Sequence, residues 1–210
     1  MRATVNPART ASYFIACDLK TYLLQCAVDF ELVLERLVEV FERLQIRYAA
    51  IGGFALGVLG APRQTMDLDF LIDRDDLAKL DTALSDLGYT RLFRSENVSQ
   101  FRHDDPAWGS LDFIHAFRKV SLAMLDRAKV CSVLAGRASM KTAQPEDVIG
   151  LKVQAMFNDP VRRLQEQRDI EALLGRYGSQ LDWNRIQEFY DVFGLVSEAK
   201  ELRRRFDRAQ

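Results

Sequence analysis

Residues 48–70 decide the fold and read YAAIGGFALGVLGAPRQTMDLDF. Residues 47–51, apolar from Tyr48 onward, predict a short strand, which Gly52 and Gly53 close, and residues 54–59 predict a short helix. Paired glycines between a strand and a helix let the backbone approach a ligand closely, and the free N–H groups of a helix start favour phosphate. A tight turn without function is the alternative explanation for this pair.

The strand predicted over residues 66–72 carries two aspartates, Asp67 and Asp69. Side chains two residues apart on a strand share one face, so both carboxylates are expected there, with the apolar residues on the other face. Like charges held this close are costly unless a cation lies between them. Two carboxylates together with substrate phosphates are a usual way to bind Mg²⁺. A solvated face near the edge of a sheet is the alternative.

Taken together, residues 51–55 (IGGFA) and 63–70 (RQTMDLDF) resemble the signature of the DNA polymerase beta-like nucleotidyltransferase superfamily. That signature is a Gly-Gly or Gly-Ser turn followed, after a short connection, by two carboxylates separated by one apolar residue. The form Arg-x-Thr-x-Asp-x-Asp is most similar to the branch that contains AbiEii-type toxins and related small bacterial transferases. It also recurs in antibiotic adenylyltransferases.

The resemblance implies that Asp67 and Asp69 bridge two Mg²⁺ ions, with Mn²⁺ as an alternative metal, and that a third carboxylate lies on a later strand. Asp112, between apolar neighbours, supplies that carboxylate, which would bind one ion and help to deprotonate the acceptor. The glycine turn would hold the triphosphate of an NTP donor, with Arg63 and Thr65 near the nucleotide. An ordinary edge-strand Asp112 and a turn-stabilising Arg63 are the alternatives.

The last third of the chain matches the AbiEii-type pattern in part. There the resemblance implies a helical Lys, here Lys152, that neutralises phosphate charge, followed by a Lys-Asp-x-x-Asp run. In this chain that run has Gln165 and Glu166 in place of its first two residues, and Asp169 matches its last acid. We therefore expect Lys152 and Asp169 at the nucleotide and make no assignment for Glu166. A solvated helical lysine is the alternative for Lys152.

The whole chain predicts an α/β (α+β) fold. A nucleotidyltransferase core, with a small mixed sheet flanked by helices, comes first, and a C-terminal helical domain follows it. We expect an irregular or partly helical lead-in over residues 1–28, the core over 29–142 and the helical domain over 143–210. Helices are predicted at 29–44, 73–87, 120–127, 145–157, 161–174, 183–193 and 195–206, and further strands at 89–93, 98–103, 110–115, 130–134 and 138–142.

Composition excludes a disordered chain, a collagen-like repeat and a coiled-coil rod. The 210 residues are 48% hydrophobic and 28% charged, as in an average soluble domain, with 29 basic and 30 acidic residues. Split at residue 140, the chain has 17 basic and 18 acidic residues before the split and 12 of each after it, so neither half is a basic module. Three cysteines without metal or redox spacing indicate reduced thiols. We expect a cytoplasmic protein without a membrane segment.

These observations predict a Mg²⁺-dependent enzyme that moves a nucleoside monophosphate from an NTP to a hydroxyl acceptor and releases pyrophosphate. The AbiEii-type resemblance implies a toxin-like enzyme with an RNA or protein acceptor and an antitoxin partner. One alternative is adenylylation of a small molecule such as an antibiotic. Another is a non-catalytic nucleotide- or partner-binding protein that keeps the fold.

Overall fold

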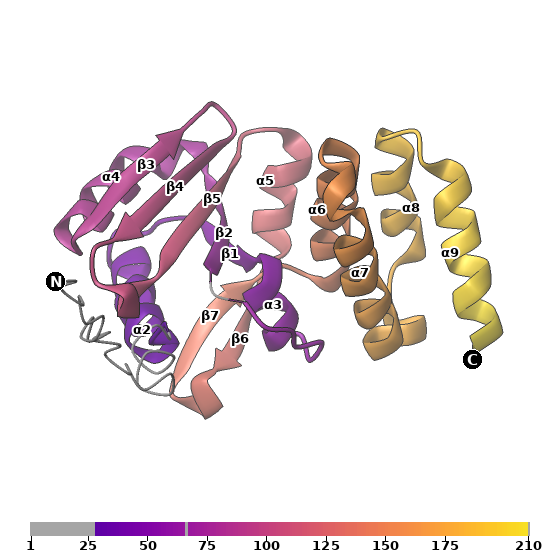
Figure 1. The fold of residues 1–210 in the computed structure, drawn as a ribbon, viewed down its shortest axis with the longest axis horizontal. Coiled ribbons are helices and arrows are strands. Elements are labelled where there is room, and N and C mark those ends of the chain that lie inside the picture. The colour runs from indigo at the N-terminus through magenta and orange to yellow at the C-terminus, as the bar shows by residue number, and fades with distance from the viewer. Residues whose placement is uncertain (1–27, 66, 210) are drawn as a thin grey trace, which may run out of the picture.

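The computed structural model describes residues 28–65 and 67–209, so the predicted lead-in over residues 1–28 lies almost entirely outside the described residues. The rest of the chain forms a mixed seven-stranded sheet with helices on both faces (Figure 1), which confirms the predicted fold class. The strands are β1 (Tyr48–Ile51), β2 (Asp67–Asp73), β3 (Tyr89–Arg94), β4 (Val98–His103), β5 (Ser110–Ala116), β6 (Lys129–Val133) and β7 (Ala138–Thr142).

The strand order across the sheet is β3-β4-β5-β2-β1-β7-β6. The central strand β2 pairs antiparallel with β1 and parallel with β5, and β1 pairs parallel with β7. The outer pairs β3–β4, β4–β5 and β6–β7 are antiparallel. Because β2 and β5 lie side by side although a helix and two strands separate them in sequence, acids that are far apart in the chain come to one place.

The predicted helices are confirmed, with shifts of a few residues at their ends. They are α2 (Phe30–Arg43), α3 (Gly52–Val58), α4 (Leu77–Asp86), α5 (Lys119–Arg127), α6 (Pro145–Asn158), α7 (Arg163–Tyr177), α8 (Trp183–Val192) and α9 (Val196–Ala209). Helix α3 begins at Gly52 itself, two residues earlier than expected, so the glycine pair is its first turn. No helix among the described residues is long and apolar enough to cross a membrane.

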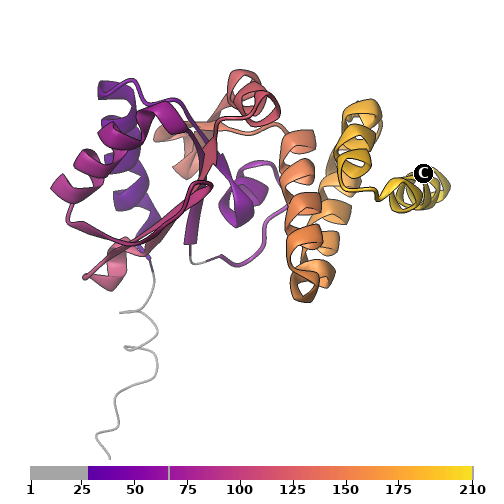
Figure 2. The same cartoon turned by 90° about the horizontal axis from the view of Figure 1, so that it is seen from above.

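Alternation along β2 divides the apolar side chains between two cores. Leu68 and Phe70 point to the face that α2 and α4 cover, while Leu71 points to the face that α3, α5 and the C-terminal helices cover. Figure 2 shows the sheet between these two layers, with α6–α9 extending away from it. The apolar residues of α6–α9 continue the second core, so the helical part packs directly on the sheet.

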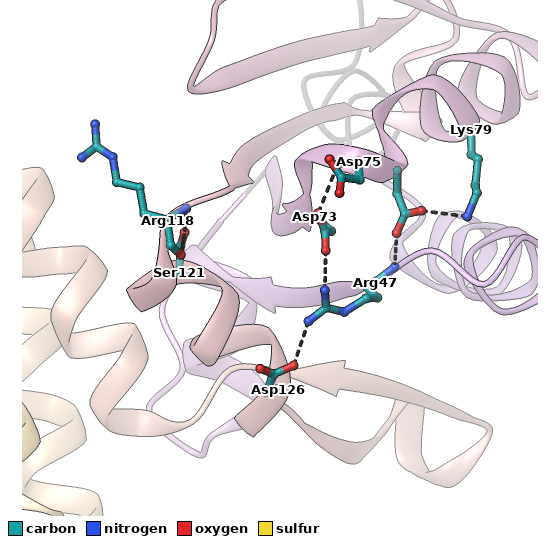
Figure 3. Close-up of polar contacts among 8 residues, drawn as sticks. Arg47, Asp73, Asp75, Lys79, Arg118, Ser121 and Asp126 are labelled. Atoms are coloured by element: carbon teal, nitrogen blue, oxygen red, sulfur yellow. Dashed lines mark hydrogen bonds and ion pairs between the residues drawn. The ribbon is translucent and has the colours of Figure 1, made fainter.

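A polar cluster fixes the entry to β1 (Figure 3). The guanidinium of Arg47 donates hydrogen bonds to Asp73 at the end of β2 and to Asp126 on α5, the latter at 2.7 Å. The Arg47 backbone N–H donates to Asp76, which also accepts from Lys79. Asp76, expected inside the first turn of a helix, instead ends a short 3₁₀ turn (Arg74–Asp76) and ties that turn to β1.

Candidate active site

Asp67 and Asp69 lie on β2, which pairs with the strand that carries Asp112. The parallel register of β2 and β5 places Asp69 opposite Asp112 and Asp67 opposite Ser110. Asp69 is half-buried, while Asp67 at the first residue of the strand is exposed. The sequence predicted one shared face for Asp67 and Asp69, and the sheet adds the third carboxylate on that same face beside Asp69.

Gly52 leaves the space that Asp69 occupies. Its φ of +63° lies in the left-handed region, and a Cβ atom placed there would lie 1.9 Å from the Oδ2 atom of Asp69. Antiparallel pairing of β1 with β2 sets Ile51 opposite Asp69, so the turn follows directly beside the carboxylate. Gly52 is therefore required both by the backbone conformation and by the close approach of Asp69.

Gly53 is packed in the same way against the connection that leads to β2. A Cβ atom at Gly53 would lie 2.8 Å from the Thr65 hydroxyl oxygen and 3.0 Å from the guanidinium carbon of Arg63. The Thr65 hydroxyl also donates a hydrogen bond of 3.1 Å to the backbone carbonyl of Asp67. The predicted Arg63 and Thr65 thus lie at the glycine turn, between it and the first acid of the strand.

Lys152 on α6 and Arg63 meet at a buried carboxylate. The Lys152 Nζ donates to Asp169 Oδ2 at 2.5 Å and to Glu166 Oε2 at 2.9 Å, and Arg63 Nε donates to the same Asp169 oxygen at 3.1 Å. Lys152, Glu166 and Asp169 are all buried, and Arg162 pairs with Glu166 at 2.6 Å. This network ties the helical part to the glycine turn, and the charge of Lys152 acts on Asp69.

The environment favours the protonated form of Asp69. Burial, together with the neighbouring charges of Asp112 and Asp67, raises its pKa from 3.8 to about 6, against the lowering effects of the Gly53 backbone N–H and Lys152. The pKa of Asp112 is also raised, first by burial and then by Asp67, while a hydrogen bond from Gln100 lowers it. Two adjacent carboxylates that both resist ionisation are a feature of sites that receive a cation.

The donor chemistry of this face fits Mg²⁺, which prefers carboxylate oxygens. Asp69 and Asp112 are neighbours across two paired strands, and the exposed Asp67 lies on the same face. Within residues 28–65 and 67–209, no three acidic, imidazole or thiol side chains already converge as a complete metal cluster. A metal here would therefore take some of its ligands from substrate oxygens or from side chains that turn toward it.

All nine predicted site residues lie in one region, joined by the contacts described above. Two further residues were missed or left unassigned. Gln100 on β4 is set opposite Asp112 by the strand register, and nothing in its own sequence marks it. Glu166, left unassigned because it departs from the AbiEii-type run, is a buried partner of Lys152. An acid one helical turn before Asp169 was the available signal for it.

The model of an uncharacterised nucleotidyltransferase family matches residues 13–195, which is most of the chain. The chain belongs to this family. It is thus a nucleotidyltransferase, and the predicted superfamily and enzyme class are confirmed, whereas membership in the AbiEii-type branch stays a prediction. A search of curated proteins finds no significant match.

Solved structures share the fold of this nucleotidyltransferase at low identity. The solution structure of the antibiotic-resistance factor ANT(2″)-Ia is 14% identical with a TM-score of 0.61, over 85% of this chain and 99% of that one. The crystal structure of the same factor in complex with adenylyl-2″-tobramycin is 13% identical with a TM-score of 0.57, over 76% of this chain and 94% of that one. An antigenic nucleotidyltransferase-like protein from Paracoccidioides brasiliensis is 18% identical with a TM-score of 0.53, over 85% of this chain and 92% of that one.

Proposed function

We propose that this nucleotidyltransferase moves a nucleoside monophosphate from an NTP to a hydroxyl group of an acceptor, with Mg²⁺ (or Mn²⁺) held by Asp67, Asp69 and Asp112. The observation that carries the proposal is the pairing of Asp69 with Asp112 across β2 and β5, directly beside Gly52. Three acids on one face of two paired strands repel one another unless a cation offsets their charge, which supports a site that holds metal. Transfer of a labelled nucleotide to an acceptor separates the enzyme from a non-catalytic nucleotide-binding protein with the same acids.

In this proposal each group has a separate task. Gly52 and Gly53 let Asp69, Thr65 and Arg63 pack closely around the turn at which the triphosphate binds, and Arg63 and Thr65 contact its oxygens from the adjoining connection. The positive charge of Lys152, which acts on Asp69, offsets part of the phosphate charge, and Asp169 accepts hydrogen bonds from both Lys152 and Arg63 and so holds them together.

Asp112 accepts the proton of the acceptor hydroxyl, whose oxygen attacks the α-phosphorus as the bond to pyrophosphate breaks. A raised pKa suits this task, since a carboxylate whose pKa lies above the ordinary value is a stronger base. Gln100, which donates to Asp112, would hold the carboxylate in the direction of the acceptor. Bound divalent metal supplies charge stabilisation for the attacking and the leaving oxygens.

A small hydroxyl-bearing molecule is the acceptor class that we favour. The factor ANT(2″)-Ia, whose whole length the fold matches, is described in complex with an adenylylated tobramycin. The even charge of both halves of the chain also gives little support for tracking an RNA backbone, which requires clustered Lys and Arg. The hypothesis of a toxin-like enzyme, with an RNA or protein acceptor and an antitoxin partner, rests on the sequence motif alone.

We also propose that the chain divides into a core over residues 29–142 and a helical domain over 143–210, and that the protein is cytoplasmic. The shared apolar core supports a helical domain that does not move freely, because separating it would expose the second face of the sheet. We expect the helical domain to complete the site through Lys152 and Asp169.

Calorimetric titration tests the nucleotide site. ATP, GTP, CTP and UTP would be titrated with Mg²⁺ into the wild type, into Asp67→Asn/Asp69→Asn, and into the control Asp86→Asn/Asp104→Asn, which removes the same charge from two exposed positions. We expect metal-dependent binding of at least one NTP that the first variant loses and the control keeps. A folded wild type that binds no NTP would refute the proposal.

The acceptor class is tested with the NTP that binds, labelled at the α-phosphate. Transfer of label to tobramycin or to another hydroxyl-rich small molecule supports the favoured class. Transfer to RNA or to protein instead would establish the toxin-like alternative.

A further inference from the structure

A cavity of about 690 Å³ lies along the flank of α3, next to the glycine turn. Helix α3 forms one wall, the end of β6 and the following turn form the opposite wall, and the connection to β2 closes one end. Figure 1 shows α3 beside β6 and β7. The lining includes Gly53, Phe54, Val58, Arg63, Val133 and Leu134. The volume lies within the range of about 300–1,000 Å³ that is usual for small-molecule pockets.

Gly57 keeps this cavity open. It lies within α3, where glycine is unfavourable for a helix, and no described atom lies within 4 Å of a Cβ atom placed on it. Gly52 and Gly53 are required by close neighbours, but packing gives no such reason for Gly57. A larger side chain at this position would enter the cavity.

The opposite wall holds strained backbone. Leu134 and Ala135 both have a φ of +54°, in the left-handed region that only glycine adopts without cost, and Gly136 follows with +91°. Such positions persist where the surrounding structure imposes them, and they are concentrated at functional sites and ligand clamps. Here they turn the backbone between β6 and β7 toward α3.

The strand order separates this cavity from the acid that would receive the acceptor. Asp112 lies on β5, on one side of β2, whereas β1, β7 and β6 lie on the other side. An acceptor that approaches Asp112 therefore uses the β5 side of the two β2 acids. The side of α3 and β6 is left for the rest of the donor nucleotide.

We infer that the cavity holds the base and ribose of the donor NTP, whose triphosphate lies at the glycine turn. This inference rests on the proposed function. Gly53, Arg63 and Thr65 line the cavity and also border the turn, so a nucleotide can span both without a break. Phe54 and Val58 on one wall and Val133 and Leu134 on the other offer apolar surfaces to the faces of a planar base. Ser132 supplies a polar group for the ribose or the base edge, while Arg63 and Thr65, at the end that the cavity shares with the turn, stay with the triphosphate.

The test fills the cavity without touching the acids. Gly57→Leu adds a side chain from the α3 wall, and Ser132→Leu adds one from an exposed position on the β6 wall. Gly175→Leu is the matched control, because Gly175 also lies within a helix and a Cβ there also has no described neighbour within 4 Å. Each variant is titrated in Mg²⁺ with the four NTPs and with inorganic tripolyphosphate, which has the phosphates but no base or ribose.

Both filling variants should raise the Kd of the NTP about tenfold or more, which corresponds to about 1.4 kcal/mol. The Kd of tripolyphosphate should stay unchanged, and Gly175→Leu should match the wild type with both ligands. If Gly57→Leu does not fold, Ser132→Leu decides the question alone.

Unchanged NTP affinity in the folded variants would overturn the inference, whether or not transfer to the acceptor is lost. Equal weakening of NTP and tripolyphosphate would also overturn it, because the base would then have no separate site. If the wild type binds neither NTP nor tripolyphosphate, the proposed function itself fails, which is a distinguishable result.

Discussion

Replacing Asp69 with asparagine should stabilise the folded protein at pH 8 and abolish nucleotidyl transfer. The Asp69 carboxylate is half-buried, lies beside Asp112 and has its pKa raised from 3.8 to about 6, chiefly by burial. Folding therefore opposes its ionisation. Asparagine keeps an oxygen that can accept from the Gly53 backbone N–H but carries no charge, so the variant removes this penalty with little change of shape.

The magnitude follows from the size of the shift. A shift of about two pKa units, at about 1.4 kcal/mol each, gives about 2 to 3 kcal/mol of destabilisation by the ionised carboxylate. Because the folded pKa is the higher one, the folded state binds more protons between pH 4 and pH 6, and the stability of the wild type falls as the pH rises through that window. The variant lacks this fall.

Urea unfolding at pH 4 and pH 8, without divalent cations, measures the difference. At pH 8 the variant should be about 2 to 3 kcal/mol more stable than the wild type, and at pH 4 most of that gain should be absent. Asp86→Asn is the control: Asp86 is exposed at the end of α4 and is not one of the site acids, so its replacement should change the stability by about 0.5 kcal/mol or less at either pH. An equal effect of Asp69→Asn at both pH values, or a loss of stability at pH 8, would refute the reasoning.

Two further substitutions examine the glycine turn and the buried lysine. Gly52→Ala should lower the free energy of unfolding by about 2 kcal/mol or more in denaturant melts, because the backbone is left-handed there and the new methyl group clashes with Asp69. Gly57→Ala in the same helix should be neutral or raise the free energy of unfolding by up to about 1 kcal/mol, because alanine favours a helix and meets no neighbour there. Equal effects at the two glycines would contradict this. Lys152→Met removes the buried cation that Glu166 and Asp169 share and leaves them with Arg162 and Arg63, so it should cost about 1.5 to 3 kcal/mol at pH 7. A thermal melt close to the wild type would show that the network contributes little.

The sequence alone determined most of the local structure. Alternation of acidic and apolar residues from Asp67 to Phe70 predicts a two-faced strand. The apolar period of α2 predicts a helix, and the glycine pair predicts the turn with which α3 begins. The shared face of Asp67 and Asp69 follows from the same repeat. The type of enzyme could be inferred at this level, since the glycine turn and the two acids are close in the chain.

Only the tertiary structure decided which distant groups join them. The pairing of β2 with β5 places Asp112 beside Asp69, and the pairing of β5 with β4 brings Gln100 to Asp112. Packing of α6 and α7 on the sheet buries Lys152 against Glu166, a residue to which the sequence motif gave no role. Strand order, register and helix packing depend on burying apolar area across the whole chain, and no local pattern of residues contains that information.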